Sequence, residues 1–191
     1  MTRFLNRARS QRGVTLIEML LVVGIMGVIG AMGAAQIAET RRAMQGDSAM
    51  RLVMAQFNTA REMAVTQRRS MELKFVGTNW MQIIRHEVPA GTTTLTSQAF
   101  EGNVTYLLVP SVTADTPDGF GNSSAIAFGS TTTSITFSSD GTLIDQSGNP
   151  LNGTVFLAVI NVPRSQRAVT VLGATGRARG YKWNGFGWTR V

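Results

Sequence analysis

One carboxylate, Glu18, lies at the start of a stretch that otherwise carries no charge. The following residues, from Met19 to Gln36, are uncharged and mostly apolar. An ionised carboxylate in apolar surroundings is costly unless a cation pairs with it. Glu18 is therefore predicted to have a specific partner.

A second group of chemically capable residues lies near the C-terminus, where the last 28 residues contain six basic residues and no acid. Arg177, Arg179 and Lys182 could contact phosphates. The aromatic residues beside them, which offer stacking faces for bases, are Tyr181, Trp183, Phe186 and Trp188. The alternative is structural: the aromatic rings bury against a sheet, Asn184-Gly185 turns a terminal hairpin, and the arginines are solvated residues that discourage edge-to-edge pairing.

Groups suited to catalysis or metal binding are few. The chain has no cysteine, which excludes a disulfide framework, a thiolate metal site and a thiol nucleophile. His86 is the only histidine and is interpreted as a surface strand residue, and no serine lies in a nucleophile elbow. Asp115 and Asp118 lack the regular spacing of calcium ligands and are interpreted as part of a solvated turn. We therefore predict no enzyme activity, no cofactor and no metal.

The elements around Glu18 are predicted to be a basic leader and a membrane-spanning helix. Residues 1–13 contain four arginines and no acid, which is typical of a cytoplasmic flank. At about 1.5 Å per residue, a helix over residues 14–38 can cross a hydrocarbon core of about 30 Å. A conventional secretory signal, cut near Gly33-Ala34-Ala35, is the alternative, but it would gain nothing from Glu18.

Beyond the anchor, apolar residues continue at helical spacing, and no proline interrupts residues 14–88. This pattern predicts one long helix from about Thr15 to about Arg69, whose second half, residues 39–70, is amphipathic. The methionines of this half that we expect to fill the core are Met44, Met50, Met54 and Met63.

From Ser70 onward the hydrophobic period changes from that of a helix to that of strands. The predicted strands cover residues 71–75, 80–84, 104–109, 126–128, 134–137, 155–160 and 168–172. Residues 110–133, rich in Ser, Thr, Gly and Ala, are predicted to be mainly a surface loop. The predicted fold is α+β: a long N-terminal helix packed on an antiparallel β-sheet domain of residues 71–191, which ends in the basic aromatic tail.

The sequence Gly13-Val14-Thr15-Leu16-Ile17-Glu18, followed by the apolar run, resembles the type III signal of type IV pilins and type II secretion pseudopilins. That signal typically reads Gly-Phe-Thr-Leu-Ile-Glu, so Val14 replaces the usual phenylalanine. The resemblance implies that a prepilin peptidase cuts after Gly13 and methylates the new N-terminus of Val14. Glu18 would then pair with the α-ammonium group of a neighbour's Val14 and set the register of assembly.

Glycine recurs every third residue in the apolar run, at Gly24, Gly27, Gly30 and Gly33. Each glycine lowers helix propensity by about 1 kcal/mol relative to alanine in water. Local unwinding when subunits pack in a filament is one interpretation. Close packing of helices through small residues is the other.

Three later segments resemble the GspH/FimT family of minor pilins and pseudopilins. They are Thr59 to Ala64 with Arg68-Arg69, Ile135 to Gly141, and Gly176-Arg177-Ala178-Arg179. The resemblance implies a type IV pilin-like fold and assembly with other pilins or pseudopilins on an inner-membrane platform, at a filament tip or in a priming complex. It also implies a single pass through the bacterial inner membrane, with the N-terminus cytoplasmic and the soluble domain outside the cytoplasm.

Two functions within this family are compatible with the sequence. GspH-like members serve the pseudopilus of type II protein secretion. FimT-like members belong to type IV pili, and some bind DNA for uptake through a Gly-Arg-x-Arg motif, which Gly176 to Arg179 matches. The expected function is filament assembly or priming, in protein secretion or DNA uptake, with Lys182 as a further candidate DNA contact.

Overall fold

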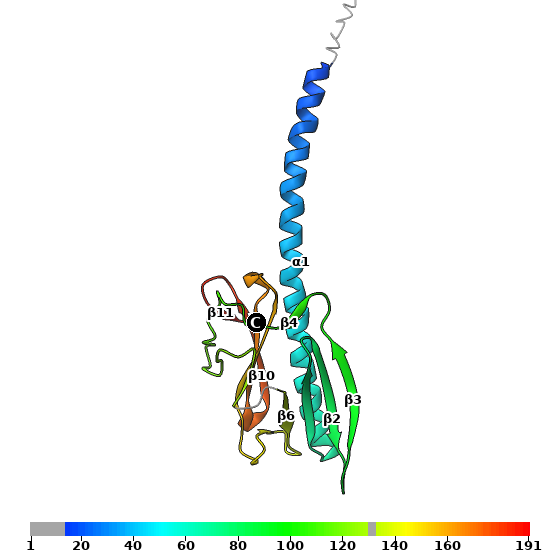
Figure 1. Cartoon of the computed structure of the whole chain (residues 1–191), viewed down its shortest axis with the longest axis vertical. Helices are drawn as coiled ribbons and strands as arrows, with labels where there is room; N and C mark the ends of the chain where they lie inside the picture. Colours follow the sequence, from blue (N-terminus) through cyan, green and yellow to red (C-terminus); the bar gives the residue numbers. More distant parts are fainter. Residues whose placement is uncertain (1–13, 130–132) are drawn as a thin grey trace, which may run out of the picture. The chain divides into compact units, whose positions relative to one another are not determined.

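The structure, a computed structural model, describes residues 14–129 and 133–191. The predicted leader and its last residue, Gly13, lie outside the described residues. The chain divides into two compact units, one ending at Glu39 and the other spanning Thr40–Val191. One helix, α1, covers Leu16–Gln67, and the strands form two antiparallel sheets (Figure 1).

Helix α1 begins where Thr15 caps it. The backbone N–H of Glu18 donates to Thr15 Oγ1 at 3.3 Å, which satisfies one of the free donors of the first turn. The helix ends at Gln67, and Arg68 has a left-handed φ of 50°. The backbone N–H of Arg69 then donates to the Ala64 carbonyl at 3.2 Å. These bounds lie within two residues of the predicted Thr15 and Arg69.

Sheet A contains five strands in the order β3-β2-β1-β6-β7. Their bounds are β1 Met71–Val76, β2 Trp80–His86, β3 Thr92–Ala99, β6 Ser134–Phe137 and β7 Leu143–Ile144. Each described pair is antiparallel. A register shift between Ile83 and Ile84 leaves Leu95 of β3 as a bulge.

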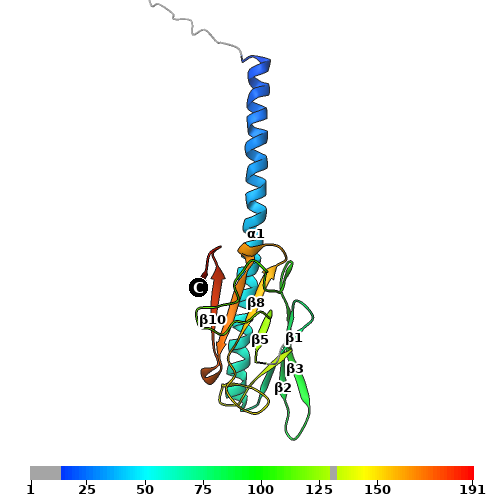
Figure 2. The ribbon, with the colours of Figure 1, turned by 60° about the vertical axis from the view of Figure 1, so that its left-hand side comes forward.

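Sheet B has the order β11-β10-β9-β8-β4, and β5 also pairs with β8. Its strands are β4 Val104–Tyr106, β5 Ile126–Phe128, β8 Gly153–Val159, β9 Arg167–Leu172, β10 Arg177–Trp183 and β11 Trp188–Arg190. Two short 3-10 helices, η1 Pro163–Ser165 and η2 Gly173–Thr175, precede β9 and β10. Figure 2 shows β8 and β10 alongside the part of α1 that follows Thr40.

The core of the Thr40–Val191 unit lies between α1 and the two sheets. Phe57 of α1 is fully buried, and its ring packs edge-on against Phe128 of sheet B and Phe137 of sheet A, at centroid distances of 6.4 and 6.5 Å. Further buried helix residues recur at three- and four-residue spacing from Ala49 to Ala64. One stripe of α1 therefore joins both sheets into a single core.

The predicted α+β fold is confirmed, and several details differ. Strand β3 was not predicted, because Thr92–Ala99 has one large apolar residue and so lacks the alternation that marks a half-buried strand. The predicted strand over residues 104–109 ends at Tyr106. Met44, predicted to fill the core, is 62% exposed, because the buried stripe of α1 begins after it; Met50 is buried as predicted.

Candidate functional site

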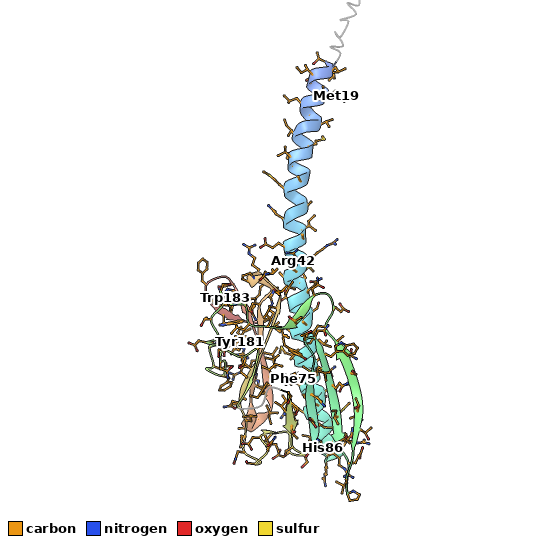
Figure 3. All side chains as sticks on the ribbon, in the orientation of Figure 1. Met19, Arg42, Phe75, His86, Tyr181 and Trp183 are labelled. Carbon is orange, nitrogen blue, oxygen red and sulfur yellow. The ribbon has the colours of Figure 1, made fainter. Side chains whose placement is uncertain are left out.

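The apolar half of α1 exposes its large side chains on every side. Between Val14 and Ile37, the exposed fraction of the large apolar residues ranges from 40% for Val22 to 79% for Leu16. Figure 3 shows side chains pointing outward around the helix near Met19. By length and composition, α1 is the one described helix able to cross a membrane. Such a surface needs lipid or other apolar helices to cover it.

The glycines of this half have no packing role inside the described chain. A Cβ atom added at Gly24, Gly27, Gly30 or Gly33 would meet no other atom within 4 Å, and α1 is continuous across all four. Unwinding and close helix packing both remain predictions, because each depends on neighbouring subunits.

Glu18 lies in the first turn of α1 and is exposed. Val14 lies just before the helix, about one turn earlier in the chain. Among the described residues, the Glu18 carboxylate forms no ion pair, so its geometry leaves it available to a cation from another molecule. Gly13, the other half of the predicted cleavage site, lies outside the described residues.

Strand β10 carries the predicted DNA contacts on two opposite faces. Gly180 faces α1, because a Cβ atom there would lie within 3.0 Å of the sulfurs of Met50 and Met54. Side chains alternate along a strand, so Lys182 shares the helix-facing side, where its charge acts on Asp47. Arg177 and Arg179 share the other side. The three cations therefore do not form one patch.

Arg179 lies beside a polar cluster centred on the Asp118 carboxylate. Thr116 Oγ1 donates to Asp118 Oδ1 at 2.9 Å, while Thr170 Oγ1 and Tyr181 Oη donate to Oδ2 at 2.6 and 3.2 Å. Burial and the Asp118 charge raise the pKa of the Tyr181 phenol, and the Arg179 guanidinium opposes this shift. Asp118 lies in a turn, as interpreted, because the Gly119 N–H donates to the Thr116 carbonyl at 2.8 Å. Its carboxylate fastens that turn to sheet B, so the interpretation of it as solvated is wrong.

Arg177 is exposed, whereas Arg179 is half-buried and its Nε atom has no hydrogen-bond partner among the described residues. Most of the neighbouring aromatic rings pack inside the domain and are not available to stack on bases. Tyr181 and Trp183 are buried, as the structural interpretation predicted, and the ring of Trp188 packs 5.5 Å from that of Trp183.

Phe186, in the turn between β10 and β11, is 97% exposed and is the one fully available stacking face of the four aromatic residues. The predicted terminal hairpin is present, and the Asn184 N–H donates to the Gly187 carbonyl at 3.1 Å across its turn.

Gly176 has a conformational role in the fold. Its φ of 62° is left-handed, and a Cβ atom there would collide with the Gly141 carbonyl oxygen and lie 2.8 Å from Arg61 Cδ. Only glycine fits this position without strain. Gly176 therefore sets the start of β10, and no ligand contact is needed to explain it.

Arg167 is the polar residue that sequence reasoning missed. It is fully buried, and its Nε donates to Asp47 Oδ1 at 2.6 Å. Its remaining nitrogens donate to the carbonyls of Arg164 and Gln166 at 2.8 Å and of Ala43 at 3.1 Å. Burial alone would raise the pKa of Asp47, but the hydrogen bond and charge of Arg167 hold it below the usual value. Arg167 thus joins sheet B to α1 and adds nothing to a surface patch.

Groups for catalysis remain sparse in the described structure. Residues 14–129 and 133–191 contain no cluster of three His, Asp or Glu side chains that could hold a metal. His86 lies at the end of β2, partly exposed as predicted, with Nε2 3.1 Å from Glu72 Oε2.

Comparisons with known proteins give two family matches and two structural ones. A family model described as the prokaryotic N-terminal methylation motif matches residues 8–34, and a model described as type II transport protein GspH matches residues 49–176. No curated protein matches the chain. Two crystal structures of the Pseudomonas aeruginosa type IV minor pilin FimU are similar at 17% and 16% identity, with TM-scores of 0.49 and 0.48. They cover 75% of this chain and 91% and 96% of their own.

Proposed function

Because the chain belongs to the GspH family, whose model covers two thirds of its length, we propose that it is a membrane-anchored minor subunit of a type II secretion pseudopilus or a type IV pilus. The family consists of structural pilins and pseudopilins and is not known for enzyme activity. A prepilin peptidase would cut after Gly13 and methylate Val14. The anchor would cross the inner membrane once, with the arginine-rich leader in the cytoplasm and the sheet domain outside it.

The observation that carries this proposal is the contrast within the anchor between its exposed apolar surface and its single carboxylate. The apolar residues from Leu16 to Ile37 can be covered first by lipid and later by the helices of other subunits. Glu18 gains nothing from lipid, because an ionised carboxylate there is costly. A neighbour's N-terminus, created by the cut before Val14, supplies the cation that removes this cost.

The role of Glu18 can be tested by assembly with the other pilins of its own system. Glu18→Ala should insert and be cut normally, yet its recovery in sheared filaments should fall about tenfold or more, since an assembled neighbour would keep an unpaired ammonium group. Glu18→Asp should retain part of the wild-type recovery. Equal recovery of wild type and Glu18→Ala would reject the pairing.

DNA binding through β10 is a second candidate function. It is favoured by the exposure of Arg177, by the place of Arg179 on the same side of β10, and by the exposed ring of Phe186. Lys182, on the opposite side, would contribute only to a long-range positive field. DNA contact would therefore be weak for one subunit and would depend on several contacts along a filament.

A further inference from the structure

We propose that the outer edge of β3 is a docking site for a β-strand of a different filament subunit, which would extend sheet A by one strand. The inference rests on the proposed function, because it assumes neighbours in a filament. It concerns an edge of sheet A, whereas β10 belongs to sheet B, and it does not depend on the Glu18 pairing.

Among the edges of the two described sheets, the edge of β3 is the long one. β3 spans eight residues, Thr92–Ala99, and contains no proline and no charged side chain. The other edge strands, β4, β5, β7 and β11, have two or three residues each. Sheet edges are normally protected by brevity, charge, proline or a β-bulge. β3 lacks the first three, and its one bulge, at Leu95, lies outside the regular part Thr96–Ala99. Figure 1 shows β3 lying outside β2.

The unpaired amides of β3 can be identified from the pattern of sheet A. The His86 N–H donates to the Ser70 carbonyl on the β1 side at 3.0 Å, so alternate residues of β2, including Met81 and Ile83, direct their backbone groups toward β3. Their partners, Gln98 and Thr96, pair inward.

Ser97 lies between Thr96 and Gln98, and Ala99 follows Gln98. The backbone N–H and C=O groups of Ser97 and Ala99 therefore point away from β2, toward the free edge of sheet A. The bulge at Leu95 interrupts the edge, so its regular part is Thr96–Ala99.

This part of β3 is held in place before any partner arrives. Thr96 Oγ1 donates to Gln56 Oε1 of α1 at 3.2 Å. Phe100 is buried immediately after the strand, and its N–H donates to the Asn79 carbonyl at 2.9 Å. A fixed strand loses little conformational freedom on pairing, which favours docking.

A hollow of about 460 Å³ adjoins the same end of β3 and indicates the chemistry of the partner. Small and apolar helix residues line it, among them Ala49, Leu52 and Ala55, together with Gln98 and Ala99 of β3. Arg51 and Glu101 also line it, so the charges balance. A strand added at this edge would place alternate side chains over α1. We expect the incoming strand to be uncharged and to carry a medium-sized apolar residue that enters the hollow.

A second copy of this chain fits the edge poorly. Its one long free edge is again β3, and antiparallel pairing of two β3 strands is a closed two-fold contact. That contact would reverse the direction of one sheet domain relative to the other. Subunits of a growing filament need contacts that repeat in one direction, so the occupant is a strand from a different subunit.

The test compares Ser97→Lys with Thr189→Lys in the full chain, expressed with the other pilins of its own system. Both changes place lysine on an exposed edge residue, but Thr189 lies on the short edge of β11. Ser97→Lys should lower recovery in sheared filaments about fivefold, because lysine opposes strand addition. Thr189→Lys should leave recovery unchanged. In wild-type filaments, the Ser97 and Ala99 amides should exchange hydrogen about tenfold more slowly than in the purified chain in detergent.

Each result separates this inference from the proposed function. Equal recovery of Ser97→Lys and wild type, or equal exchange rates in filaments and detergent, overturns the docking edge and leaves the filament role standing. Absence of wild type from filaments overturns both proposals. Dimerisation of the purified full chain in detergent that Ser97→Lys abolishes would make the occupant a second copy, which contradicts the proposed partner. If Ser97→Lys fails to fold, the exchange rates of wild type decide alone.

Discussion

The two halves of α1 contain many of the same apolar residue types, but those residues are covered in opposite ways. From Leu16 to Ile37, the large apolar side chains are exposed in the single chain. From Thr40 to Gln67, one stripe of the helix is buried by two sheets, and its buried polar neighbour Arg167 is paired. The first half therefore depends on a membrane or on other subunits, whereas the second belongs to a domain that supplies its own core.

Removing one large side chain from each half of α1 tests this comparison with the largest expected difference in stability. Phe57→Ala should lower the free energy of unfolding of the sheet domain by about 4 kcal/mol, because it leaves a cavity between the sheets. Leu21→Ala, in the exposed half, should change it by less than about 0.5 kcal/mol. Tryptophan fluorescence of the full chain during denaturant unfolding in detergent can measure both, since all three tryptophans follow Thr40. Similar losses for the two variants would contradict the division.

The buried ion pair should have the next largest effect. Arg167→Ala should destabilise the domain by about 3 kcal/mol, since it removes four hydrogen bonds and leaves Asp47 unpaired. The pKa of Asp47 is lowered in the fold, so its stabilisation is present above the usual value of 3.8 and lost as the pH falls through the lowered pKa.

Unfolding curves between pH 7 and pH 2 should therefore show a smaller acid-dependent loss for Arg167→Ala than for wild type. Arg177→Ala, an exposed arginine of the neighbouring strand, is the matched control and should cost less than about 0.5 kcal/mol. An equal cost for the two arginines would mean that the Asp47 pair does not stabilise the domain.

Gly176 and Gly148 both have a left-handed φ, but only Gly176 lies close to other atoms. Replacing each by alanine separates the cost of a steric clash from the cost of the backbone conformation. Gly176→Ala should cost about 2 kcal/mol, because the added methyl group meets Gly141 and Arg61 at an unfavourable φ. Gly148→Ala shares a positive φ of 83° but has open space around it, so it should cost about 1 kcal/mol. Thermal unfolding of the two variants gives the difference. An equal cost would show that the close approach at Gly176 contributes nothing.

The smallest expected effect concerns DNA. The full chain in detergent should shift DNA in a mobility assay at low salt with a Kd of about 10 μM, without sequence preference, and lose the shift toward physiological salt. Arg177→Gln should weaken the shift more than Arg179→Gln, because Arg179 lies beside Asp118. Lys182→Gln is the control on the opposite side of β10. The absence of a wild-type shift, or unchanged binding by the folded double variant of Arg177 and Arg179, would remove the DNA function.

Local sequence patterns predicted the features that depend on neighbours in the chain. Apolar spacing and the absence of proline gave the long helix, and alternation gave most strands of both sheets. The features that were missed depend on distant residues. Arg167 was counted with the basic tail, although its partner Asp47 lies 120 residues earlier. The two residues that donate hydrogen bonds to Asp118, Thr170 and Tyr181, follow it by 52 and 63 residues. No local pattern around Asp118 could therefore indicate that its carboxylate is bound within the fold.

The central claim is that the exposed half of α1 is a pilin anchor produced by cleavage after Gly13. The mass of the mature chain tests this claim most directly. On co-expression with a prepilin peptidase, intact mass should show a chain that begins at Val14 and carries one methyl group. Gly13→Val should leave the precursor uncut. A chain that begins after Ala35, or a cut that does not depend on Gly13, would contradict the account.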